Sequence, residues 1–159
     1  MPESSPPCPA ADTHPTAADI RLAAMNLLAR REHSLRELRD KLKRRFANLA
    51  VIDEQLSRLA EEGLQSDARF AQSYARQRID RGYGPLRMRE ELRERGVTES
   101  DIDSALQELA VDWRVLAGAV LQKKFGVHPP EDFTEKARRA RFMQYRGFAM
   151  EHYHLDADD

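Results

Sequence analysis

The stretch RGYGPLRMREELRERGV, residues 81–97, places two glycines and a proline between arginine-rich segments, a composition that can serve phosphate binding. A dinucleotide-binding loop has the form G-x-G-x-x-G after a strand, and Arg87 occupies the third glycine position here. Gly82 and Gly84 instead suit the end of one helix, and the proline that follows suits the first turn of the next. The stretch is therefore interpreted as a joint between helices, in which Tyr83 either packs over the joint or contacts a partner.

Residues that could hold a metal ion or act as nucleophiles are few. His152 and His154 are two positions apart, so on a helix they point about 200° apart and cannot share a metal ion. Cys8 is the only cysteine and lies in a proline-rich segment that offers no scaffold for an oriented base. The chain also has no H-E-x-x-H motif and no nucleophile elbow. We therefore predict a protein that is not an enzyme and that binds no metal ion and no cofactor.

Basic side chains provide the candidate binding surface. Although the formal net charge is -1, residues 30–45 contain eight basic and three acidic side chains, residues 76–95 seven and four, and residues 123–146 seven and three. Such segments create strong local fields that suit acidic protein surfaces or nucleic-acid phosphates, the alternative being helix faces that are only solvated. The candidate partner-binding residues are Arg30, Arg31, Arg36, Arg39, Lys43, Arg44, Arg76, Arg81, Tyr83, Arg87, Arg89, Arg138, Arg139, Arg141 and Arg146.

The cationic segments recur because the chain contains an internal repeat. When the sequence is shifted by 50 residues without a gap, apolar residues fall on apolar residues, and two arginines and an aspartate fall on their own kind. A further shift of 51 places residues 95–97 on 146–148, which indicates a fainter third copy. The pairs at the first shift are Ile20 and Phe70, Ala24 and Tyr74, Leu38 and Met88, Leu42 and Leu92, Ile52 and Ile102, Leu56 and Leu106, Leu59 and Leu109, Arg39 and Arg89, Arg45 and Arg95, and Asp53 and Asp103.

Apolar residues recur at three- and four-residue steps within each copy, which indicates helices, and no segment sustains the alternation of a strand. Residues suited to helix caps mark the boundaries: Ser34 with Glu37, Thr98 with Asp101, and the glycines Gly63, Gly96 and Gly147. The predicted helices are residues 18–32, 34–46, 51–62, 67–81, 85–95, 98–110, 113–125, 132–146 and 148–155.

These nine helices predict an all-α fold, an elongated tandem array of three three-helix, helix-turn-helix-like repeats. The repeats are expected at residues 17–64, 65–111 and 112–155. Residues 1–16 hold five of the eight prolines and hardly any large apolar side chain, so we expect a disordered tail there. Residues 156–159 are expected to form an acidic tail.

Three-helix units commonly bind DNA by placing their third helix in the major groove, where phosphates favour positive charge. The predicted third helices do not fit that role. Residues 51–62 carry four acidic side chains against Arg58, and residues 98–110 carry four acidic and no basic side chains. The cations lie instead on the second helix of each unit and at the end of the first. Base reading by the third helix is disfavoured, whereas phosphate contact through the second helices stays possible.

The residues also resemble the RecX family of regulatory proteins, which modulate the RecA recombinase. The resemblance extends over about residues 20–153 and rests on residues 24–42 (AMNLLARREHSLRELRDKL), 66–97 (SDARFAQSYARQRIDRGYGPLRMREELRERGV) and 136–148 (KARRARFMQYRGF). It implies a cytoplasmic, non-enzymatic protein of tandem three-helix repeats. It also implies a protein that binds the RecA nucleoprotein filament and restrains its ATPase and strand exchange in recombination, DNA repair and the SOS response.

Two functions therefore stay open at the level of sequence. The first is a modulator of the RecA filament. The second is an architectural or regulatory DNA-binding protein that contacts single- or double-stranded DNA through its basic second helices, and a helical adaptor with solvated charges is a remote third. The chain has no apolar run long enough to cross a membrane, so we expect a cytoplasmic protein. We also expect a monomer.

Overall fold

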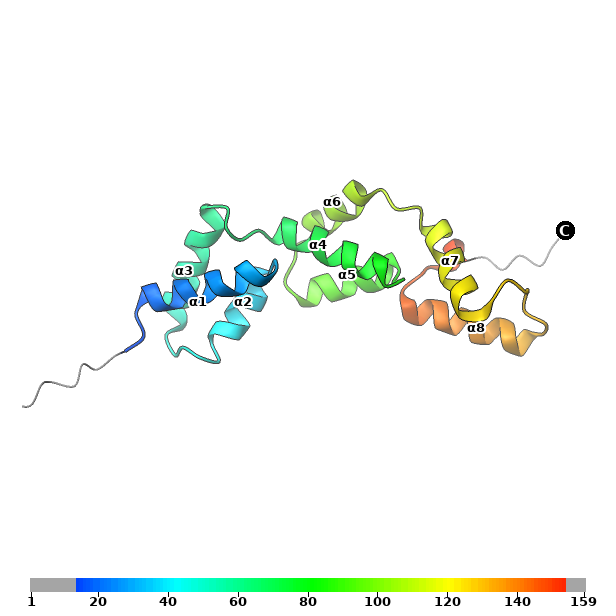
Figure 1. The fold of residues 1–159 in the computed structure, drawn as a ribbon, viewed down its shortest axis with the longest axis horizontal. Helices are drawn as coiled ribbons and strands as arrows, with labels where there is room; N and C mark the ends of the chain where they lie inside the picture. The colour runs from blue at the N-terminus through cyan, green and yellow to red at the C-terminus, as the bar shows by residue number, and fades with distance from the viewer. Residues whose placement is uncertain (1–13, 154–159) are drawn as a thin grey trace, which may run out of the picture.

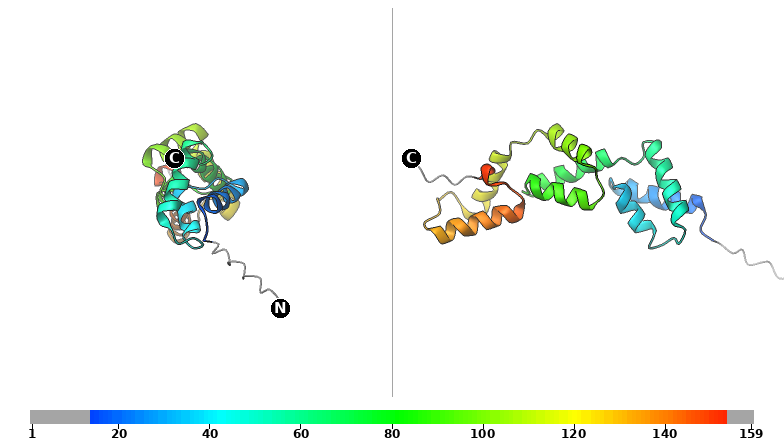
Figure 2. Two further views of the ribbon diagram at one scale, coloured as in Figure 1. Left: turned by 90° about the vertical axis from the view of Figure 1, so that its left-hand side faces the viewer. Right: turned by 180° about the vertical axis from the view of Figure 1, so that it is seen from behind.

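The computed structural model describes residues 14–153 and contains, over that range, eight α-helices, one short 3-10 helix and no β-strand. The helices form three successive units that lie in a row, so the molecule is elongated (Figure 1). Seen along the row, the units overlap within a narrow outline (Figure 2). The predicted all-α tandem array is confirmed. Most of the predicted tail 1–16, including Cys8, and all of residues 156–159 lie outside the described residues.

The first unit consists of α1 (Ala17–Arg30), α2 (Leu35–Leu42) and α3 (Leu49–Glu61). Ser34 forms the predicted reciprocal capping box with Glu37, and this box starts α2 after a short turn from α1. The apolar stripes of the three helices meet in one core, because each helix presents its buried positions at three- and four-residue steps. The buried residues of this core are Ile20, Ala24, Leu38, Leu42, Phe46, Ile52, Leu56 and Leu59.

The second unit consists of α4 (Asp67–Asp80), α5 (Pro85–Glu94) and α6 (Glu99–Leu109). One of the two hydrogen bonds predicted for the α6 cap forms, since the Asp101 amide donates to the Thr98 hydroxyl. The unit has its own core, made of Phe70, Ala71, Leu92, Val97, Ile102 and Ala105.

The third unit consists of α7 (Trp113–Phe125), α8 (Phe133–Arg146) and the 3-10 turn η1 (Met150–His152). Its core is smaller than those of the first two units, and its buried members are Ala117, Met143, Phe148 and Tyr153. The three units therefore have three separate cores, and they contact one another through the turns between helices.

The predicted ninth α-helix, residues 148–155, is wrong, because the described part of this segment forms only the 3-10 turn. Phe148 and Tyr153 are both buried in the core of the third unit. Residues five positions apart on an α-helix point about 140° apart, so an α-helix could not turn both side chains into one core. The tighter turn, in which the Ala149 amide donates to His152 Nδ1, lets both side chains pack inward.

Helix α2 is also shorter than predicted, ending at Leu42 rather than at residue 46. The amides of Arg45 and Phe46 both donate to the Leu42 carbonyl, so the chain turns after the helix. This turn still brings Phe46 into the core, which explains why its spacing suggested a longer helix.

Candidate partner-binding surface

The fifteen candidate residues do not form one exposed set. The exposed ones are Arg30, Arg31, Arg36, Lys43, Arg44, Arg76, Arg81, Arg138 and Arg141. The half-buried ones are Arg39, Tyr83, Arg87, Arg89 and Arg146. Arg139 is buried, with 6% of its surface exposed. The half-buried and buried members hold the fold together, as the following contacts show.

Within the first two units, the acidic third helix neutralises part of the charge of the basic second helix. Arg39 Nε on α2 lies 2.7 Å from Asp53 Oδ1 on α3. At the equivalent positions of the second unit, Arg89 Nη1 on α5 lies 2.7 Å from Asp103 Oδ1 on α6. Two of the three polar matches in the 50-residue repeat, Arg39 with Arg89 and Asp53 with Asp103, are therefore explained by one ion pair that occurs in both units. The second helices present less free positive charge than their sequences suggest.

Seven exposed candidates have no ion-pair partner anywhere in the described part of the chain, and we name them the unpaired arginines. Every unit contributes at least two of them. Because no carboxylate of the described residues lies within ion-pair distance of them, their guanidinium groups remain available to an acidic or phosphate-bearing partner. The unpaired arginines are Arg30, Arg36, Arg44, Arg76, Arg81, Arg138 and Arg141.

The first two units meet at a contact that we name the first joint, where the turn between α1 and α2 lies against the ends of α4 and α5. Ser34 Oγ donates to the Arg95 carbonyl over 2.7 Å, and the Leu35 amide donates to Asp67 Oδ1 over 2.9 Å. Arg95 Nε lies 3.5 Å from Glu37 Oε1 across the same contact. Side chains therefore make most of the polar contacts at this joint.

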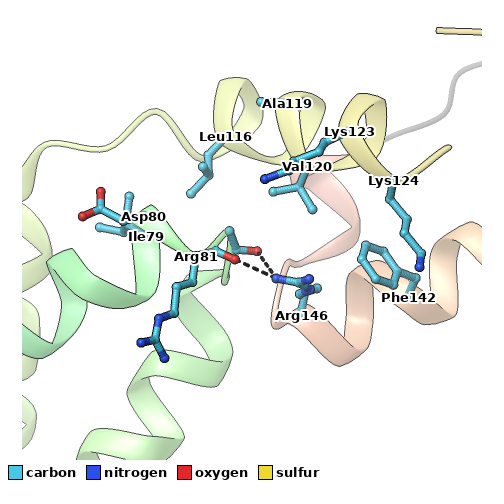
Figure 3. A pocket seen from close by; sticks show the side chains of 11 residues that line it. Ile79, Asp80, Arg81, Leu116, Ala119, Val120, Lys123, Lys124, Phe142 and Arg146 are labelled. Carbon is cyan, nitrogen blue, oxygen red and sulfur yellow. Dashed lines mark hydrogen bonds between the residues drawn. The ribbon is translucent and has the colours of Figure 1, made fainter. Parts of the chain in front are cut away.

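The second and third units meet at the second joint, which the glycine-containing turn before α5 forms with the end of α8. The Gly84 amide donates to the Arg146 carbonyl over 2.8 Å, and the Leu86 amide donates to the Gly147 carbonyl over 3.0 Å. In return, Arg146 Nη1 donates to the Arg81 carbonyl over 2.7 Å (Figure 3). The interpretation of residues 81–97 as a joint between helices holds, and the turn also joins two units.

Tyr83 lies at the centre of the second joint. The guanidinium carbons of Arg78, Arg87 and Arg146 lie 4.3, 4.8 and 4.7 Å from the centre of its ring, a geometry that favours cation–π attraction. Arg87 also donates from Nη1 to the Tyr145 carbonyl of α8 over 3.0 Å. Tyr83, Arg87 and Arg146 therefore have packing roles at the joint.

Glu91 anchors this cluster from α5. Its carboxylate accepts hydrogen bonds from Arg78 Nε and the Tyr74 hydroxyl, both over 2.7 Å, and from Arg87 Nε over 3.0 Å. Burial alone would raise the pKa of Glu91, but the hydrogen bonds from Arg78, Tyr74 and Arg87 outweigh burial and lower the pKa to about 2. Glu91 is thus ionised at neutral pH and ties α4 to the arginine that reaches the third unit.

The Arg139 side chain makes its polar contacts within the third unit. Its Nη1 donates to the His128 carbonyl over 2.9 Å, and its Nη2 lies 2.6 Å from Glu135 Oε1. These bonds fix the loop between α7 and α8. Arg138 and Arg141, its neighbours on α8, are exposed, so a partner can reach these two candidates but not Arg139.

Sequence reasoning missed three residues that build the joints: Arg78, Glu91 and Arg95. A signal was present for Arg95 alone, because an arginine–glycine pair follows or ends a helix at 81–82, 95–96 and 146–147, and the arginine carbonyls of the last two pairs accept a hydrogen bond from the preceding unit. The expected end-of-helix glycines fit this pattern, since Gly63, Gly96 and Gly147 all adopt positive φ angles.

The described residues contain no cluster of three or more histidine, cysteine, aspartate or glutamate side chains placed to hold a metal ion. Over the same range, none of the helices has both the length and the apolar character that a membrane crossing needs.

Comparison with known proteins matches all three units. Family models of the first, second and third three-helix domains of RecX match residues 21–59, 66–106 and 116–152. The chain is 49% identical over 136 residues to the regulatory protein RecX of Pseudomonas putida strain GB-1, covering 86% of this chain and 87% of that protein. It is 48% identical over 136 residues to the RecX protein of Pseudomonas entomophila strain L48, covering 86% and 88%.

Two solved structures share the fold. A crystal structure of regulatory protein RecX superimposes with a TM-score of 0.68 at 23% identity, covering 90% of this chain and 74% of that one. The structure of RecX from Lactobacillus salivarius gives a TM-score of 0.66 at 20% identity, covering 86% and 90%. With three domain models in sequence order and close relatives over most of its length, this chain belongs to the RecX family of regulatory proteins.

Proposed function

We propose that this protein binds the RecA nucleoprotein filament and restrains its ATPase and strand-exchange activities. The observation that carries the proposal is membership of the RecX family, which the resemblance links to RecA. The architecture supports it, because a filament presents the same surface at regular intervals and a row of similar units can make similar contacts along it.

The unpaired arginines are the proposed contacts with the filament. Each unit exposes at least two of them, whereas Arg39 and Arg89 are already paired within their units. A nucleoprotein filament offers both phosphates and acidic side chains, and either would be attracted to an arginine that no carboxylate neutralises. The weak attraction of single exposed charges would add up over three units.

DNA binding without RecA is the alternative function. The unpaired arginines suit phosphates in general, which favours it. Against it, α6 has acidic residues in its first turn and no basic residue in its last, so this helix would be repelled from a DNA groove. Any DNA contact is therefore expected to be with the backbone and not to depend on sequence.

A RecA ATPase assay on single-stranded DNA tests the proposal. At fixed RecA, adding the protein is expected to lower the rate of ATP hydrolysis at concentrations far below those that coat the DNA. Raising the DNA concentration separates the two functions: inhibition that survives excess DNA supports filament binding. Full relief by DNA alone would favour DNA competition, and an unchanged rate would refute the proposal.

A further inference from the structure

A cavity of about 370 Å³ lies at the second joint, between the end of α4 and the facing sides of α7 and α8. Its volume falls within the range of small-ligand pockets. The half-buried side chains of Ile79, Leu116, Val120 and Phe142 give it an apolar floor (Figure 3). Because three helices from two units build the pocket, it exists only when the joint is formed.

Four cations surround this floor: Arg81, Lys123, Lys124 and Arg146. None of them has an ion-pair partner within the described range, 14–153, and Asp80 is the only acidic residue that lines the pocket. Elsewhere in the molecule many basic side chains are paired with carboxylates. An apolar floor inside a positive rim therefore suits a ligand that is both acidic and apolar.

The aromatic residue of the pocket argues against a nucleic-acid base as the apolar part of the ligand. Lys124 Nζ and the Arg146 guanidinium carbon lie 5.6 and 5.2 Å from the centre of the Phe142 ring, and Phe125 packs against it edge-on at 5.4 Å between centres. Base stacking needs a free aromatic face. Because the Phe142 ring is already in contact with these three groups, it is better suited to contact an aliphatic side chain than to stack on a base.

We propose that this pocket binds an acidic peptide segment of a protein partner, with one aliphatic side chain on the apolar floor and flanking carboxylates on the four cations. Arg146 is oriented for this role, because its Nη1 bond to the Arg81 carbonyl fixes the guanidinium beside the cavity. The proposal deepens the proposed function, on which it rests for the filament as the source of the segment. Its test uses no RecA, so the two proposals can fail separately.

Fluorescence anisotropy with the full chain tests the pocket. The probes are a fluorescein-labelled peptide EDLLDE, the matched peptide EDSSDE and a hexathymidylate of comparable charge. The leucine peptide is expected to bind about tenfold more tightly than the serine peptide, since the leucines bury apolar surface on the floor. Equal binding of the two peptides would overturn the proposal, as would stronger binding of the oligonucleotide.

Charge reversal locates the site. In the variant Lys123→Glu with Lys124→Glu, the dissociation constant for the leucine peptide is expected to rise at least about tenfold. The matched control is Arg114→Glu with Lys136→Glu, which makes the same change in net charge within the third unit at exposed positions outside this pocket. The control is expected to bind like the wild type, with circular dichroism showing that both variants are folded. An equal loss in both variants would mean diffuse attraction and would contradict the site.

Discussion

The two joints occupy equivalent positions of the repeat but are built by different chemistry. Ser34 and Gly84 are related by the 50-residue shift, and each donates a hydrogen bond to the carbonyl of an arginine at the end of the second helix of the following unit. At the first joint the donor is the Ser34 hydroxyl, whereas at the second joint it is the Gly84 amide itself. Side chains thus make most of the polar contacts at the first joint, whereas the second joint adds two backbone-to-backbone hydrogen bonds to the side-chain contacts of Arg87 and Arg146.

This difference sets how closely the units approach. At the second joint, a side chain at residue 84 would overlap the carbonyl of Gly147, and one at residue 147 would overlap Arg87. At the first joint, a Cβ atom at Gly96 would lie 3.0 Å from the Cβ of Arg36, a contact that a small shift can relieve. The second joint is therefore the sterically stricter one, and the proposed peptide pocket depends on it.

Gly84→Ala is expected to have the largest effect on the joints. The added methyl group meets backbone atoms of residues 147 and 148, which cannot rotate away, so we expect a loss of about 2 to 3 kcal/mol of stability. Urea denaturation followed by the fluorescence of Trp113, the only tryptophan, measures the third unit directly.

The control for this variant is Gly118→Ala on α7, where a new methyl group meets no atom within 4 Å. It is expected to leave stability unchanged or to raise it by up to about 1 kcal/mol, because alanine favours the helix. If the two variants denature at the same urea concentration, the second joint is not sterically strict.

Glu91→Gln is expected to cost about 2 kcal/mol at pH 7, because it removes the charge that holds Arg78 and Arg87. The folded state lowers the pKa of Glu91 from 4.5 to about 2, so the ionised carboxylate stabilises the fold above pH 4.5, and this contribution is lost as pH falls toward 2. Stability curves of wild type and variant should therefore converge in acid.

Glu54→Gln is the matched change in an exposed pair, with Arg58 Nη2 at 2.8 Å from Glu54 Oε1. Solvent screens this pair, so we expect a cost below about 0.5 kcal/mol at any pH. If the difference in unfolding free energy between the wild type and Glu91→Gln stays constant from pH 7 down to pH 2, the role of the Glu91 carboxylate is contradicted.

Ser34→Ala is expected to have a smaller effect, about 1 kcal/mol. The hydroxyl accepts a hydrogen bond from the Glu37 amide at the start of α2 and donates one to the Arg95 carbonyl. Thermal unfolding of Ser34→Ala and Ser34→Gly measures the loss. Because the first joint keeps its other side-chain contacts, the units should stay docked; a loss as large as that of Gly84→Ala would mean that the joints are equally strict.

The sequence predicted much of this fold because local signals and the repeat agree. The Ser34 and Thr98 caps and the three-residue steps of α3 and α6 depend only on nearby residues, and these elements occur where they were expected. The 3-10 turn at Met150 could not be predicted, because it depends on Phe148 and Tyr153 filling one core.

The candidate site was harder to predict than the fold. The composition of the second helices shows that they are basic, but not that Arg39 and Arg89 face carboxylates of the third helix. Burial of Arg139 likewise depends on a loop eleven residues earlier in the chain. Which charges are free is a property of the packed units, so composition overstates the exposed charge.

The central claim is that the unpaired arginines bind the filament. It is tested most directly by the protein concentration that halves the RecA ATPase rate on single-stranded DNA, measured for the wild type and for two charge-reversed variants. Arg44→Glu with Arg76→Glu reverses two unpaired arginines, and Arg58→Glu with Arg93→Glu reverses two arginines that are already in ion pairs. We predict that half-inhibition needs about tenfold more of the first variant than of the wild type, and that this difference shrinks at high salt. The concentration of the second variant for half-inhibition should stay within about twofold of the wild-type value. Equal inhibition by wild type and both variants would contradict the claim that the unpaired arginines bind the filament.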